Sequence, residues 1–221
     1  MKALNLISEQ IPVLHPGDSV KHAQNYMRRL QLAQLPLVDE DKKLLGIVWA
    51  SDLRKADSPK MELKDFQYQQ TDRYVHEDDH VFEVLKVASR QKLDVIPVLT
   101  KEEKFAGSIT IDRLMNYFAE ETEILEPGGI IVLEMKASDY SLAEIARIVE
   151  SQNAHITGLF VGREKNSAQM QVILKLDKPD VQNIVQSLER FNYSIKEIFQ
   201  ESEYFHDLKE RYDSLMSYLN L

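Results

Sequence analysis

Two stretches in the first half of the chain carry the same order of apolar and polar positions. When the sequence is shifted by 61 residues, one stretch falls on the other without a gap. The apolar segment Leu35–Val38 falls on Ile96–Leu99, and Gly46 falls on Gly107. Apolar positions with helical spacing repeat as well: Val20, Ala23 and Met27 fall on Val81, Val84 and Ala88. We interpret this match as an internal duplication.

Each copy predicts the same series of elements. Asp18-Ser19 and Asp78-Asp79 are predicted to be the N-cap residues of the two helices. A short apolar strand follows, and it holds a proline, which cannot donate to a sheet and is expected at a strand start or sheet edge. Gly46 or Gly107 then opens a second strand that leads into a short helix. One β-α-β-β-α unit cannot bury its own apolar face, so we expect the two copies to pack as an obligate pair.

The last third of the chain has a different pattern. Pro127-Gly128-Gly129 indicates a linker. Apolar runs predict four strands, over residues 130–135, 155–161, 170–176 and 193–199. Between them lie two helices, one capped by Ser141 and one with Pro179 near its N1 position. Their predicted apolar faces are Leu142, Ile145, Ala146 and Val149, and Val181, Ile184, Val185 and Leu188. The order βαββαβ is the ferredoxin-like, split βαβ arrangement.

The final residues predict one more helix. Its apolar positions are spaced by three and four residues: Phe205, Leu208, Tyr212, Leu215 and Leu219. Such a helix either lies on its own domain or pairs across a dimer. The predicted fold class is therefore α+β, a tandem pair of repeats followed by a ferredoxin-like domain and a C-terminal helix. The predicted boundaries are 1–60 and 61–119 for the repeats, 120–129 for the linker, 130–200 for the second domain and 201–221 for the helix.

The order of apolar strand, capped helix, proline-containing strand, charged turn and glycine-led strand resembles the CBS motif, present here twice over residues 6–118. Proteins with this motif commonly bind adenosyl compounds between the paired repeats, so the resemblance implies AMP, ADP or ATP as a regulatory ligand. In the motif's G-h-h-T-x-x-D ending, where h is an apolar residue, the aspartate can accept hydrogen bonds from the ribose hydroxyls. The threonine lies beside a helix N-terminus that favours phosphate. The ligand-binding residues that the resemblance implies are Leu14, Leu35, Pro36, Ser51, Asp52, Val75, Ile96, Pro97, Thr110 and Arg113.

Each copy keeps only half of that ending. The first has Trp49 where threonine is expected but retains Asp52, and the second retains Thr110 but has Arg113 where aspartate is expected. Asp112 is one residue early, which turns its side chain by about 100° around the helix. Two interpretations stay open. Either the pair binds an adenine nucleotide weakly, in the half of the cleft that belongs to the second repeat, or Trp49 fills the cleft of a ligand-free scaffold.

The segment that begins SLAEIARIVE and continues to Leu159 resembles the first helix and second strand of an ACT domain. ACT domains are often effector-binding or dimerising modules, and members that bind an effector usually carry glycine at the first strand–helix turn. Tyr140 stands there in this chain, and its ring would fill such a pocket, which favours a dimerising role. A CBS pair followed by an ACT-like domain resembles the bacterial acetoin-utilisation regulatory proteins.

Composition narrows the function further. The chain is 43% hydrophobic, has no cysteine and carries a formal net charge of −9, so we expect a globular cytoplasmic protein that binds no nucleic acid. No apolar run is long enough to span a membrane. The histidines show no metal-ligand spacing, and His15 and His76 are expected to be structural. Because no catalytic motif is present, we predict a regulatory homodimer that is not an enzyme and holds no metal, with a ligand-free interaction adaptor as the alternative.

Overall fold

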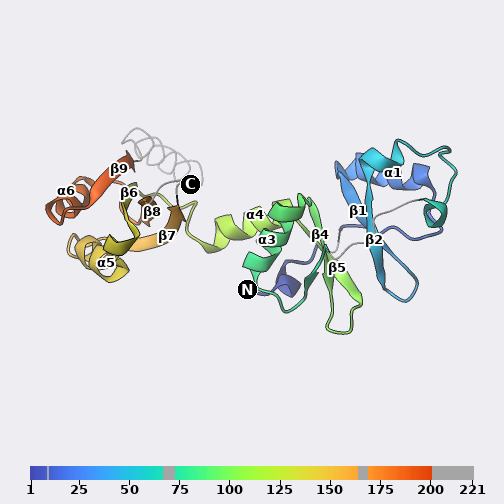
Figure 1. Ribbon diagram of the computed structural model, residues 1–221, viewed down its shortest axis with the longest axis horizontal. Helices are drawn as coiled ribbons and strands as arrows, with labels where there is room; N and C mark the ends of the chain where they lie inside the picture. Colours follow the sequence, from blue (N-terminus) through green and yellow to red (C-terminus); the bar gives the residue numbers. More distant parts are fainter. Residues whose placement is uncertain (9, 67–72, 164–168, 201–221) are drawn as a thin grey trace, which may run out of the picture. The chain divides into compact units, whose positions relative to one another are not determined.

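The computed structural model describes residues 1–8, 10–66, 73–163 and 169–200 (Figure 1). The chain divides into two compact units, Met1–Phe118 and Ala119–Leu221, and each is described by itself. The predicted helix over residues 201–221 lies outside the described residues. In the described part of the chain, no helix is long and apolar enough to cross a membrane.

The first unit contains the two repeats. The first repeat consists of α1 (Val20–Leu30), β1 (Gln34–Val38), β2 (Leu44–Trp49) and α2 (Ala50–Leu53). Its opening strand is reduced to a single parallel bridge between Leu14 and Leu37. The second repeat has the complete predicted series: β3 (Val75–His76), α3 (Val81–Gln91), β4 (Val95–Leu99), β5 (Phe105–Thr110) and α4 (Ile111–Glu121). Hairpins β1–β2 and β4–β5 are both antiparallel, with a bulge at the equivalent place.

Each repeat is completed by a segment from outside its own β-α-β-β-α series. A short 3₁₀ turn, Ala3–Leu6, packs on the second repeat, where Val81 N donates to Met1 O and Ala3 N donates to Asp79 O. A second 3₁₀ turn, Leu63–Asp65, packs in the same way on the first repeat. There Val20 N donates to Met61 O and Leu63 N donates to Asp18 O. Each repeat is therefore packed against a chain segment that lies outside its own series, and both repeats belong to one compact unit.

Pro36 of the hairpins is placed as predicted, but Pro97 and the two glycines are not. Pro36 lies within β1, which is an edge strand, but Pro97 lies in the middle of β4, the central strand of its sheet. The paired residues of β3 and β4 begin at Val98. Pro97 lies just before them, so its missing N–H costs the sheet no hydrogen bond within this pairing. The second strand of each hairpin also starts two residues before the glycine that was predicted to open it.

The two long helices of the first unit use different caps. Ser19 is the N-cap of α1, and its hydroxyl accepts from His22 N at 3.2 Å. The predicted caps Asp78-Asp79 are wrong, because the N-cap of α3 is His80, whose Nδ1 accepts from Phe82 N at 3.3 Å. Asp79 instead accepts from His76 N at 2.7 Å, as Asp18 does from His15 N at 2.7 Å. Each aspartate therefore closes the turn before its helix, a use common for this side chain.

The second unit has the predicted βαββαβ order. Its elements are β6 (Ile130–Lys136), α5 (Leu142–Glu150), β7 (Ile156–Arg163), β8 (Gln169–Leu176), α6 (Gln182–Arg190) and β9 (Ser194–Phe199). A 3₁₀ turn, Ala137–Asp139, joins β6 to α5. The sheet is antiparallel, in the order β7-β8-β6-β9. Alternate residues of β6 and β8 pack with both helices to form the core of the unit.

Local details of this unit differ from the expected pattern. Ser141 caps α5 as predicted, accepting from Glu144 N at 3.3 Å, but Leu142 is 46% exposed and Ile148 is buried in the core instead. Pro179 is not at N1, since α6 begins at Gln182. Gly128 and Gly129 are buried, and a Cβ at Gly128 would lie 2.0 Å from Leu176 O. These glycines are required for close backbone approach.

Candidate functional site

The second repeat presents a threonine and an arginine at the start of a long helix. Thr110 ends β5, and α4 follows directly with eleven residues. The hydroxyl of Thr110 accepts from Arg113 N at 3.1 Å, so it satisfies one of the free N–H groups of the first turn. Ile111 N donates to Asp94 O at 2.9 Å, which fixes the start of α4 against β4. The Arg113 side chain is exposed. Fixed N–H groups and a guanidinium together favour phosphate oxygens.

The equivalent corner of the first repeat has different chemistry. Trp49 is half-buried, and its side chain packs against the core of the second repeat. The following helix, α2, has only four residues. Within it, Asp52 Oδ1 pairs with Lys55 Nζ at 3.0 Å, while Ser51 is exposed. Both groups of the Asp52–Lys55 pair are on the surface, where an ion pair contributes little free energy. A ligand hydroxyl could therefore replace Lys55 as the partner of Asp52 at small cost.

The apolar residues expected beside a base lie inside the two cores. Pro36 and Pro97 are buried. The aliphatic residues are at most 1% exposed: Leu14, Leu35, Val75 and Ile96. These side chains are therefore part of the cores and are not accessible to a ligand. A ligand beside these segments could contact only their backbone.

Two contacts that join the repeats have no counterpart in the sequence prediction. Gln34 is fully buried, and with its amide oxygen directed at β4 it accepts from Asp94 N at 2.7 Å and from Val95 N at 3.2 Å. Ile47, on β2, packs in the core of the second repeat. No periodicity argument identifies these residues, because both depend on how one copy meets the other.

Ser108 is a further polar residue in this region. It is 1% exposed, and its Oγ has no hydrogen-bond partner among the described residues. Ser108 and Thr110 are two positions apart in β5, so both project from the same face of the sheet. The sequence signal was available: the residue 61 positions earlier is Ile47, so a hydroxyl replaces an aliphatic side chain at this duplicated position.

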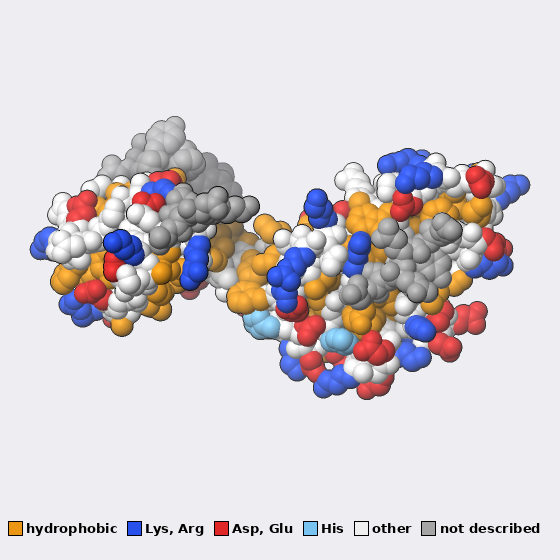
Figure 2. All heavy atoms as spheres, viewed as in Figure 1, with side chains coloured by type: hydrophobic (Ala, Val, Ile, Leu, Met, Phe, Trp, Pro, Cys, Tyr) orange, Lys and Arg blue, Asp and Glu red, His pale blue; other side chains and the backbone are white. Residues whose placement is uncertain are grey.

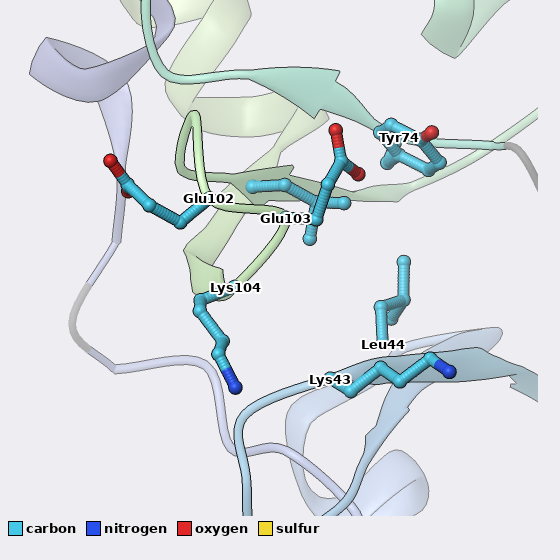
Figure 3. A pocket seen from close by; sticks show the side chains of 7 residues that line it. Lys43, Leu44, Tyr74, Glu102, Glu103 and Lys104 are labelled. Carbon is cyan, nitrogen blue, oxygen red and sulfur yellow. The ribbon is translucent and has the colours of Figure 1, made fainter.

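A cavity of about 350 Å³ opens between the tips of the two hairpins (Figure 3). Its lining holds none of the predicted ligand residues: Lys43, Leu44, Tyr74, Leu99, Glu102, Glu103 and Lys104. Two of its charged groups are already bonded, since Lys104 Nζ donates to Asp41 O at 2.6 Å and Glu103 lies 3.0 Å from His76 Nε2. The cavity carries both signs of charge and therefore has no clear preference for an anion.

A second hollow is acidic. Residues 15–18 and 39–41 line about 710 Å³. The carboxylates of Asp18 and Asp39 already accept from the backbone N–H groups of His15 and Lys43, at 2.7 and 2.8 Å. In the part of the chain that the structure describes, no group of three or more potential ligand side chains is arranged to hold a metal ion.

Tyr140 follows the short turn after β6 in the second unit. Its side chain is half-buried and packs against the core formed by the sheet and both helices. Nearby, Tyr193 OH donates to Glu144 Oε2 at 2.8 Å, and burial together with this bond raises the pKa of Tyr193 to about 12. Tyr140, at the strand–helix turn, therefore packs against the protein's own core.

Comparison with known proteins agrees with the duplicated pattern. Residues 3–58 and 68–120 each match the family model of the CBS domain. A crystal structure of a CBS domain pair/ACT domain protein from Thermotoga maritima superposes with a TM-score of 0.50 at 20% identity, covering 55% of this chain and 98% of that one. A structure of CBSX2 in complex with AMP has a TM-score of 0.48 at 17% identity, covering 54% of this chain and 97% of that one.

Curated relatives match over a limited part of their length. Homoserine O-acetyltransferase of Methanobrevibacter ruminantium is 29% identical over 110 residues, which is 50% of this chain and 22% of that protein. Inosine-5'-monophosphate dehydrogenase of Aquifex aeolicus is 30% identical over 144 residues, which is 62% of this chain and 29% of that protein. The chain thus spans less than a third of either relative, and the two relatives have unrelated activities.

Proposed function

We propose that the tandem CBS domain pair of this chain is a cytoplasmic, non-enzymatic regulatory module that binds an adenine nucleotide weakly in its second repeat. CBS pairs are regulatory and often bind adenosyl compounds, which supplies the class of ligand. The unrelated activities of the curated relatives favour a regulatory role for the shared stretch over a catalytic one.

The arrangement of Thr110 and Arg113 is the observation that carries this proposal. Thr110 caps an eleven-residue helix, and Arg113 stands exposed in its first turn. Phosphate oxygens would gain charge-assisted bonds from the guanidinium together with the positive end of the helix dipole. Ser108 adds a hydroxyl without a partner on the same face of β5, within the described residues.

Recognition of the sugar is expected to be poor. The position that would supply a ribose carboxylate in this repeat is Arg113, and Asp112 points elsewhere on the helix. In the first repeat Asp52 is present, but Trp49 occupies the position of the threonine. Affinity should therefore follow the number of phosphates, with ATP and ADP above AMP and adenosine last.

A thermal-shift series tests this order. A ligand that binds only the folded protein stabilises it by RT ln(1 + [L]/Kd), about 2.7 kcal/mol at a hundredfold excess over Kd. We expect the midpoint of unfolding to rise in the order adenosine, AMP, ADP, ATP, and the ATP effect to shrink as salt increases. Equal shifts from adenosine and ATP would contradict the phosphate-based mechanism.

The alternative is a ligand-free adaptor that works by dimerising and binding a protein target. The packing of Trp49 on the second repeat and the Asp52–Lys55 pair favour it, because both use potential ligand groups internally. The second unit fits this alternative as an ACT-like domain that dimerises rather than senses an amino acid, since Tyr140 packs at the turn where an effector would sit. No shift from any of the four compounds would favour the adaptor.

A further inference from the structure

Helices α5 and α6 both pack on the same face of the sheet in the second unit. The core residues of β6 and β8 alternate along each strand and contact both helices, among them Ile131, Leu133, Val172 and Leu174. Successive side chains of a strand point to opposite faces, so the residues between these core residues belong to the other face of the sheet. We call it the open face. Where one face of an antiparallel sheet meets water, its side chains are commonly polar.

The open face instead has an apolar row across three neighbouring strands. Val132 on β6 pairs with Ile173 on β8, and Ile173 pairs with Phe160 on β7. Beside this row, Ile130 pairs with Phe199 on β9. Phe160 and Phe199 are 54% and 52% exposed, Ile130 and Ile173 are half-buried, and Val132 at the centre is 7% exposed. In Figure 2, hydrophobic side chains reach the surface of this unit among charged and polar ones.

Polar residues border the apolar row on both sides. Along β8, the open face carries Gln171, Ile173 and Lys175 in turn. Glu134, the pairing residue of Gln171 on β6, accepts from Lys196 Nζ at 3.2 Å. At the other border, Lys175 Nζ donates to Glu126 O at 2.9 Å. An apolar centre with bonded polar groups on either side fits an amphipathic helix, whose apolar stripe has polar margins.

The chain continues from the border of the open face with a segment of this kind. β9 ends at Phe199, and residues 201–221 lie outside the described residues. The helix predicted there has one apolar stripe: Phe205, Leu208, Tyr212, Leu215 and Leu219. The stripe is about 21 Å long in a helix, and β8, with eight residues, is about 24 Å long. A helix about 10 Å wide covers the two central strands, β6 and β8, and leaves Phe160 and Phe199 at its margins.

We infer that residues 201–221 fold back as an amphipathic helix onto the open face of their own chain, with the apolar stripe on Val132 and Ile173. Because the segment begins directly after β9, its effective concentration at this face is about millimolar. At micromolar protein, the segment of a second copy cannot compete with that. Of the two positions open to the predicted helix, its own domain or a dimer interface, this selects the first. The inference does not depend on nucleotide binding.

A single thiol on the open face reports whether the face is covered. The chain has no cysteine, so Ile173→Cys supplies the only reactive group. Adding Leu208→Glu and Leu215→Glu puts charges on the apolar stripe and should release the segment. We expect the thiol of Ile173→Cys then to react with a maleimide at least about tenfold faster, since labelling requires an uncovered face.

Matched variants control for added charge and for general unfolding. Ser214→Glu and Ser217→Glu add the same charges to the segment outside its apolar stripe, so they should leave the labelling rate of Ile173→Cys unchanged. Glu189→Cys places the thiol at an exposed position of α6, on the side of the helices. Its labelling rate should be the same with and without the charges on the stripe, which shows that the rest of the unit stays folded.

Dilution separates the chain's own segment from that of a second copy. Labelling of Ile173→Cys should proceed at the same rate constant at micromolar and nanomolar protein, because docking within one chain does not depend on concentration. An Ile173→Cys thiol that reacts equally fast with and without Leu208→Glu and Leu215→Glu would overturn the inference. Protection that disappears on dilution would also overturn it, and would assign the covering segment to another copy.

Discussion

Trp49 and Thr110 occupy the same position in the two repeats, at the ends of β2 and β5, and they have opposite roles. The Trp49 side chain packs against the core of the other repeat, whereas the Thr110 hydroxyl caps the helix that follows it. The two halves of the pair have the same series of elements, but they cannot hold the same ligand in the same way. The nucleotide-binding proposal depends on Thr110 being available to phosphate, and the ligand-free adaptor alternative depends on Trp49 filling the cleft.

Replacing Trp49 tests whether the indole fills a ligand site. We expect Trp49→Thr to lower the free energy of unfolding by about 2–4 kcal/mol, because part of a large buried surface is lost. The variant should also gain or strengthen binding of AMP or ATP, with Asp52 accepting from the ribose. Chemical denaturation and calorimetry measure the two effects.

Trp49→Phe serves as the control for that experiment. It keeps an aromatic ring in place, so it should lose less stability and gain no nucleotide binding. A Trp49→Thr protein with unchanged stability and no new affinity would mean that the indole does not occupy the site.

Gly128 tests the packing at the start of the second unit. Any Cβ added there would meet Leu176 O at 2.0 Å, a contact that the backbone must move to relieve. We expect Gly128→Ala to destabilise the protein by about 3 kcal/mol, the upper end of the range for overpacking. Gly17→Ala is the matched control, because nothing lies within 4 Å of its added Cβ. Thermal unfolding of both variants measures the difference, and equal midpoints would contradict the close approach.

Asp78 tests a pH-dependent contact between the chain's first residues and the second repeat. Hydrogen bonds from Lys101 and Lys2 lower the pKa of Asp78 from 3.8 to about 2. A carboxylate with a lowered pKa in the folded state stabilises the protein above its usual pKa, and this contribution is lost as the pH falls toward the folded pKa. Between about pH 4 and pH 2, the wild type should therefore lose more stability than Asp78→Asn.

The matched control is Asp57→Asn, which removes an exposed carboxylate of the first repeat. Its loss of stability with falling pH should follow that of the wild type, measured by denaturant unfolding at each pH. If the wild type and Asp78→Asn lose the same free energy of unfolding as the pH falls, Lys2 and Lys101 do not bind this carboxylate in solution.

Much of the fold could be predicted because the chain repeats itself. Both long helices of the first unit were located from apolar positions with helical spacing, Val20, Ala23 and Met27, and from their copy 61 residues later. These residues are buried as expected. Apolar runs located β6 and β8 in the second unit. These patterns predict the elements because each element buries apolar side chains against a core.

The remaining features depend on contacts between distant segments. The attachment of Ala3 to the second repeat has no local signal, since Ala3 N donates to the backbone of Asp79, more than 70 positions away. His80 was missed as a cap because histidine seldom has that role. The Thr110 hydroxyl was placed correctly at a helix start. The duplicated position of Ser108 holds Ile47, so the sequence could have singled Ser108 out, but the lack of a hydrogen-bond partner for its Oγ among the described residues depends on how β5 packs.

Isothermal titration calorimetry of ATP into the wild type and Arg113→Ala tests the central claim most directly. Arg54→Ala, which removes an exposed arginine of the first repeat, is the control for overall charge. If the second repeat holds the phosphates, the wild type and Arg54→Ala should bind ATP with the same affinity. Arg113→Ala should bind at least about tenfold more weakly, as expected for one charge-assisted contact. Undiminished ATP affinity in Arg113→Ala, or adenosine binding as tight as ATP in the wild type, would contradict the account.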